Sequence, residues 1–207
     1  MATGRPLPWS SWQEWQQVGD WLFAGTREAE ASAISRISAW RARGRVPLGA
    51  DLAATLIELR QRDQPGASSA ESAEAVLQMQ YSMAFIRLVN GVADSAQKGK
   101  VASSVANLAG YAGIPRMLID IRHEASHNEL PALPLLRTAA SQALAWLQAT
   151  YWKLQSEHLV ACRERTHDLL EELFSSRLLA AERQRKRQRH PTGDDWPGDP
   201  KSAPQSS

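Results

Sequence analysis

The chain has 207 residues, 43% of them hydrophobic, and a formal net charge of +2 at pH 7. This length fits one domain with an appendage better than two domains, and the near-neutral charge argues neither for nor against a nucleic-acid partner. The single cysteine, Cys162, excludes an internal disulfide framework, and the absence of long apolar runs predicts a soluble intracellular protein without a membrane span.

Helical periodicity dominates the sequence, and no segment alternates convincingly as a strand does. Ser11 and Glu14 have the spacing of a capping box, Gly44 is placed to end a helix, and Pro115 is placed to begin one. The sequence predicts helices over about residues 12–23, 27–43, 50–62, 71–92, 102–111, 115–128 and 135–189, the last being one very long helix or two abutting ones.

The apolar side chains of these helices define the expected core. On the fourth helix it comprises Val76, Met79, Met83, Ile86 and Val89. The eight tryptophans are expected mainly as packing anchors, with base stacking as the alternative and Trp196 exposed in a polar tail.

The expected organisation is an all-α domain over residues 1–155, a charged helical extension over 156–189 and a disordered tail over 190–207. Five basic residues gather at the end of the extension: Arg183, Arg185, Lys186, Arg187 and Arg189. Such a cluster is typical of a nuclear-localisation signal or a phosphate-contacting patch, and equally of the solvated end of a long helix.

The chemistry of the chain centres on Arg122, His123 and His127. The two histidines are four residues apart, so they share one helical face, with their bases about 6 Å apart. Histidine ionises near neutral pH and suits acid–base work, and a guanidinium matches a phosphate that gains charge in the transition state. This set suits cleavage of RNA by its own 2′-hydroxyl, with no metal or other cofactor.

The same segment, residues 123–127, also reads His-Glu-Ala-Ser-His, the pattern of a zinc protease. Against this interpretation, no third ligand follows nearby, since Glu157 is about 30 residues away, and the chain has no strand to line a substrate cleft. Glu129 also stands where an apolar packing residue is expected. A purely structural role for the histidines at a helix end is a further alternative.

Several segments resemble the Las-one family of endoribonucleases that process pre-ribosomal RNA, whose catalytic domain belongs to the HEPN superfamily. The resemblance covers residues 7–155 in order. It is carried by residues 37–47 (ISAWRARGRVP), 83–91 (MAFIRLVNG), 113–131 (GIPRMLIDIRHEASHNELP), 145–147 (AWL) and 151–152 (YW).

The resemblance implies a HEPN-like helical bundle in which Arg122, His123 and His127 are catalytic. It also implies a homodimer with a composite active site, and cleavage of the second internal transcribed spacer of pre-rRNA in the nucleus or nucleolus. The expected products carry 2′,3′-cyclic phosphate and 5′-hydroxyl ends, and a polynucleotide kinase then phosphorylates the 5′-hydroxyl. Because the family's C-terminal regions bind that kinase and this chain ends soon after its basic run, the kinase partner is implied less directly than the homodimer.

Arg87, Asn90 and Arg116 are weaker candidates, either as RNA contacts or as supports of the site, and salt bridges and packing explain them equally well. A non-catalytic RNA-binding or scaffold role within the pre-rRNA processing complex is the alternative function.

Overall fold

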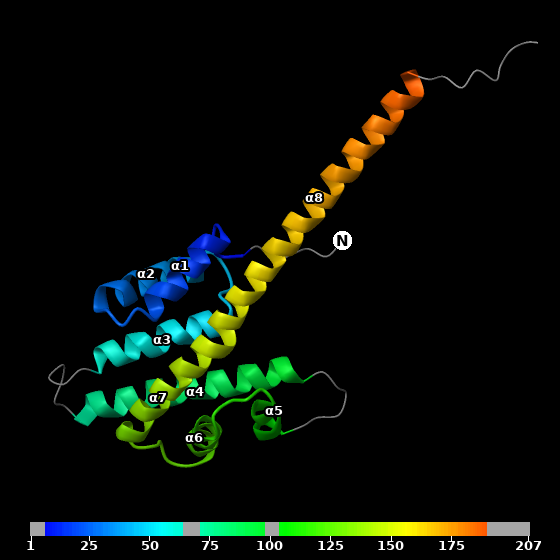
Figure 1. Ribbon diagram of the computed structural model, residues 1–207. Coiled ribbons are helices and arrows are strands. Elements are labelled where there is room, and N and C mark those ends of the chain that lie inside the picture. Colours follow the sequence, from blue (N-terminus) through cyan, green and yellow to red (C-terminus); the bar gives the residue numbers. More distant parts are fainter. Residues whose placement is uncertain (1–6, 64–70, 98–103, 190–207) are drawn as a thin grey trace, which may run out of the picture. The chain divides into compact units, whose positions relative to one another are not determined.

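The structure, a computed structural model, describes residues 7–63, 71–97 and 104–189 (Figure 1). Every regular element in these ranges is helical, which confirms the predicted all-α class. The elements are α1 (Trp12–Leu22), α2 (Arg27–Arg43), α3 (Leu48–Arg62), α4 (Glu71–Ala96), α5 (Val105–Tyr111), α6 (Arg116–His127), α7 (Leu133–Leu147), the π-helical segment η1 (Gln148–Lys153) and α8 (Leu154–Arg189).

The chain divides into two compact units, Met1–Glu157 and His158–Ser207. In the first unit, α1 packs on α2, α3 packs on α4, and α7 contacts both α3 and α4. In Figure 1, α6 is seen nearly end-on beneath α4, so it runs across α4 and not along it. This crossing brings only part of α4 beside the motif.

The second unit is described as far as Arg189, and up to there it is the continuation of α8. Nearly every side chain described in this stretch is exposed, including those of the basic residues Arg183, Arg185 and Lys186. The predicted tail 190–207 with Trp196, the predicted loop 64–69 and most of the connector 97–100 lie outside the described residues. Within the described ranges, no helix is both long enough and apolar enough to cross a membrane.

The core face of α4 differs in part from the predicted one, of which Val89 is buried as predicted. Val76, Met79 and Met83 are 51%, 61% and 56% exposed, so their prediction as core residues was wrong. Tyr81 and Phe85 are buried instead. The helix carries apolar side chains on more than one face, and the packing of α3 and α7 decides which face is covered.

The tryptophans gather largely in one aromatic cluster of the first unit. Trp15 stacks on Trp152 with ring centroids 4.6 Å apart, and Trp9 lies 5.3 Å from Trp40. These four rings are buried, which confirms their prediction as packing anchors, whereas Trp12 is 38% exposed.

The helix predicted over 135–189 runs without a break from Leu133 to Arg189, and the π-helical segment η1 separates its two α-helical parts, α7 and α8. η1 places Tyr151 over Gly49 of α3, where a Cβ atom would lie 2.5 Å from the ring carbon Cγ. The next residue, Trp152, packs against Trp15 of α1. Two consecutive aromatic rings thus contact two different helices.

Candidate functional site

Helix α6 carries the predicted motif, and its sequence separates a buried side from an exposed one. Leu118, Ile119 and Ile121 are buried, and the helix contacts α4, α5 and α7. Pro115, expected as the first helical residue, is instead the N-cap, and the helix ends at His127. Because the apolar side packs against these helices, the opposite side, which carries the histidines, faces solvent.

His123 and His127 stand next to each other on this exposed side. Their ring centroids are 5.0 Å apart and the ring planes are inclined by 51°. Both side chains are exposed. The prediction that the i, i+4 spacing places both imidazoles on one face is confirmed.

Arg122 lies at the edge between the buried and the exposed sides of α6 and is half-buried. Its Nε donates a hydrogen bond of 2.9 Å to Oδ1 of Asn90 on α4. Among the described residues, no carboxylate forms an ion pair with this guanidinium. The structure therefore joins one of the weaker candidates, Asn90, directly to the motif.

The position of Asn90 depends on a close approach between α4 and α3. A Cβ atom at Gly91 would collide with Cδ2 of Leu48 at the start of α3. Glycine therefore lets the two helices meet at this point. The residue beside Asn90 thus lies against the side chain of Leu48.

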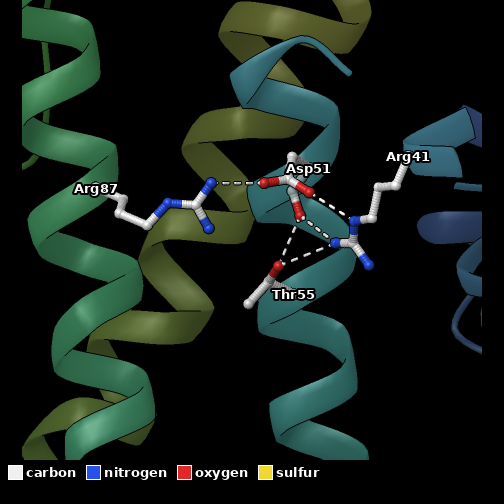
Figure 2. Close-up of polar contacts among 4 residues, drawn as sticks. All are labelled: Arg41, Asp51, Thr55 and Arg87. Carbon is white, nitrogen blue, oxygen red and sulfur yellow. Dashed lines mark hydrogen bonds and ion pairs between the residues drawn. The ribbon is translucent and has the colours of Figure 1, made fainter. Parts of the chain in front are cut away.

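Arg87 has a different set of partners (Figure 2). Its Nη2 donates a 2.8 Å hydrogen bond to Oδ2 of Asp51 on α3, while Oδ1 of Asp51 accepts 2.7 Å from Nε of Arg41 on α2. Arg41 also donates to the Thr55 hydroxyl at 3.2 Å. One carboxylate thus connects α2, α3 and α4. Sequence reasoning missed Asp51, because its partners are 10 and 36 residues away in the chain.

Arg116 forms an ion pair of 2.9 Å with Asp120, one turn further along α6. Both side chains are largely exposed, and a pair of this kind contributes little to stability. The structure therefore pairs Arg116 within its own helix, whereas it pairs Asn90 with Arg122.

The described residues contain no group of three or more His, Cys, Asp or Glu side chains that could hold a metal ion. In that part of the chain, His123 and His127 thus lack the third protein ligand that a zinc site uses. What the face offers is two imidazoles and one guanidinium, a set suited to proton transfer beside an anion.

Comparison with known proteins gives a consistent picture. The Las1-like family profile matches residues 7–154. The ribosomal biogenesis protein LAS1L of Mus musculus is 31% identical over 159 residues, covering 75% of this chain and 20% of the mouse protein. The protein LAS1 of Saccharomyces cerevisiae is 31% identical over 160 residues, covering 73% of this chain and 32% of the yeast protein.

The pre-rRNA-processing protein las1 of Schizosaccharomyces pombe is 33% identical over 119 residues, which cover 58% of this chain and 23% of that protein. The chain thus spans between a fifth and a third of the length of these curated relatives. The match of the family profile includes all of α1 to α7 and the whole motif-bearing face. The chain therefore belongs to the Las1-like family.

Proposed function

We propose that this chain is a metal-independent endoribonuclease of the HEPN type that acts in pre-rRNA processing. The observation that carries the proposal is the pair of exposed imidazoles, 5.0 Å apart, beside an arginine with no carboxylate partner in the described part of the chain. Two imidazoles on one helical face and a guanidinium at the edge of that face suit a phosphodiester better than an uncharged substrate.

The reaction is a transesterification within the RNA. One histidine takes the proton of the 2′-hydroxyl, whose oxygen forms a bond to phosphorus while the bond to the 5′-oxygen breaks. Another histidine protonates the departing 5′-oxygen, and Arg122 stabilises the charge on the equatorial oxygens. The products are a 2′,3′-cyclic phosphate and a 5′-hydroxyl, and a polynucleotide kinase would complete the sequence by phosphorylating the latter.

The geometry also favours a homodimer with a composite site. The entering and leaving oxygens of an in-line displacement lie on opposite sides of the phosphorus atom. His123 and His127 are neighbours on one helical face. Histidines of a second copy, facing this helix, would place a proton acceptor and a proton donor on the two sides.

A surface for this second copy lies on α4. Val76, Met79 and Met83 form an exposed apolar strip, and Asn90 continues it on the same helical face by the 3.6-residue period. Asn90 lies two helical turns beyond Met83 and contacts Arg122, so a copy that covers α4 from the strip to Asn90 would reach the site.

The names of the relatives support a pre-rRNA substrate. Two of them are named for ribosome biogenesis or pre-rRNA processing. We extend this to cleavage in the second internal transcribed spacer, and we place the chain in the nucleus, in the nucleolus where pre-rRNA is made. The exposed arginines and lysine of α8 would add contacts to phosphates.

Incubation of the purified chain with a spacer RNA in EDTA tests the proposal. We expect the wild-type chain to cleave the RNA in the presence of EDTA and the His127→Ala variant to be inactive. The control is His167→Ala, which replaces an exposed histidine on α8 and should cleave as the wild type does. The 5′ ends should accept phosphate from a polynucleotide kinase without prior phosphatase treatment. Cleavage by the His127→Ala chain contradicts the assignment, loss of wild-type activity in EDTA favours the zinc alternative, and RNA binding without cleavage favours the scaffold role.

A further inference from the structure

The hydrogen bond between Arg122 and Asn90 has an unusual chemical character within this protein. Other arginines with resolved partners contact carboxylates: Arg36 contacts Glu14, Arg41 and Arg87 contact Asp51, Arg60 contacts Glu30, Arg116 contacts Asp120 and Arg137 contacts Asp63. Arg122 is bound through Nε to a neutral amide oxygen. Its charge is therefore fixed in place without being neutralised.

We propose that Asn90 is a positioning residue that orients Arg122 toward the scissile phosphate while leaving the full positive charge available. This proposal rests on the proposed ribonuclease function and deepens it, because it assigns a role to the neutrality of the acceptor. An aspartate in the same place would hold the guanidinium equally well, but it would compete with the phosphate for it.

The geometry supports this role in two ways. The contact uses Nε at 2.9 Å, and in the described part of the chain no further hydrogen bond engages the two terminal nitrogens. Those nitrogens form the fork that binds two phosphate oxygens at once. Both partners are also half-buried, so the hydrogen bond is sheltered from competing water.

The position of Asn90 is held by its neighbours on α4. It lies between the core residue Val89 and Gly91, where α4 meets Leu48 of α3. An acceptor on a rigid helix, held by packing on both sides, can fix the direction of an arginine more closely than one on a loop. A displacement of about 1 Å at such a site costs on the order of 100-fold in rate.

Two substitutions separate the orienting role from the electrostatic one. Asn90→Ala removes the acceptor but leaves the charge of Arg122, so we expect kcat to fall about 10- to 100-fold while KM changes little. Asn90→Asp keeps an acceptor and adds a competing charge. We expect this variant to fold normally and to lose at least as much activity, because the guanidinium is neutralised.

The salt dependence of binding gives the readout that a purely structural role would not move. Single-stranded DNA of the spacer sequence lacks the 2′-hydroxyl and cannot be cleaved by the proposed route, so its affinity can be measured at several salt concentrations. Each phosphate contact contributes a slope of about −0.7 to the logarithmic plot for a single strand. The slope should become shallower by about this amount in Asn90→Asp and in Arg122→Ala, but not in Asn90→Ala.

Asn107 on α5 offers a matched control, because it is an exposed asparagine whose side chain makes no resolved contact. Asn107→Ala and Asn107→Asp should keep wild-type cleavage and wild-type slope. Melting temperatures of all variants report whether the fold is retained.

The outcomes distinguish the two proposals. Wild-type cleavage and slope in Asn90→Asp, or wild-type kcat in Asn90→Ala, would overturn the role of Asn90 while leaving the ribonuclease intact. If the wild-type chain does not cleave RNA, the proposed function fails. In that case a shallower salt dependence of binding in both Asn90→Asp and Arg122→Ala still supports Asn90 as the residue that keeps Arg122 free to bind a phosphate.

Discussion

The indole Nε1 of Trp40 donates a 2.9 Å hydrogen bond to Oε1 of Glu14, which links the last turn of α2 to the first turn of α1. The backbone N–H of Ser10 donates 2.7 Å to the other carboxylate oxygen, the Ser10 hydroxyl donates to it as well, and Arg36 lies 3.7 Å from Oε1. Burial would raise the pKa of Glu14, but these hydrogen bonds and the charge of Arg36 outweigh it and lower the pKa from 4.5 to about 2.

This contact makes stability depend on pH in the acid range. Because the folded state favours the carboxylate, its contribution is present above the unfolded pKa near 4.5 and is lost as the pH falls toward 2. Glu14→Gln should lower the free energy of unfolding at pH 7 by roughly 1 to 2 kcal/mol, since solvent screens part of the interaction. Denaturant titrations between pH 7 and pH 2 should show that the free energy of unfolding falls less in the variant than in the wild type as the pH is lowered. An unchanged pH profile would contradict the role of Glu14.

The close contact of Gly49 with Tyr151 gives a second prediction. A methyl group at Gly49 would lie 2.5 Å from Cγ of the ring, so α3 and η1 would have to move apart. Gly49→Ala should therefore destabilise the first unit by about 1 to 3 kcal/mol. Gly110→Ala on α5 is the control, because nothing lies within 4 Å of its added carbon, and it should be neutral or slightly stabilising. Equal unfolding midpoints for the two variants would show that the η1 packing is looser than described.

The Asp51 cluster gives a third prediction, in the form of a thermodynamic cycle. Asp51→Asn removes the charge between Arg41 and Arg87 and should lower the free energy of unfolding by roughly 1 to 3 kcal/mol. Arg87→Met removes an ion pair whose arginine side chain is 49% exposed and should cost less than about 1 kcal/mol.

In Asp51→Asn the two arginines repel each other, whereas the double variant lacks Arg87 and has no such repulsion. Its loss of unfolding free energy should therefore be smaller than the sum of the losses of the two single variants. Chemical denaturation of the four proteins measures the cycle. Strict additivity would mean that Asp51 and Arg87 are not energetically coupled.

The proposed homodimer makes activity depend on protein concentration. The cleavage rate per chain should fall on dilution below the dimer dissociation constant, and Met79→Glu should shift this fall to higher concentration because two copies would bring like charges together. Gln80→Glu adds the same charge at the next, also exposed, position of α4 and should leave the curve unchanged. A rate per chain that stays constant over a wide dilution range, with monomers seen by sedimentation, would rule out the composite site.

The sequence alone determined the helical class, most helix positions and the shared face of His123 and His127. These features follow from local rules. Ser11 caps the start of α1, Gly44 ends α2, and the 3.6-residue period sets which residues share a face, and none of these depends on residues distant in the chain. It also supplied the resemblance on which the catalytic assignment rests, and family membership is confirmed. The roles of Arg122, His123 and His127 stay predictions.

Only the tertiary structure decided which faces are covered and which polar groups meet. Met79 and Met83 read as core residues in the pattern, yet no described helix covers them. Asn90 and Arg87, one turn apart on α4, were equivalent candidates in the sequence, but one contacts Arg122 and the other contacts Asp51. Their partners lie 32 and 36 residues away, and such pairings depend on how whole helices pack, which local periodicity does not encode.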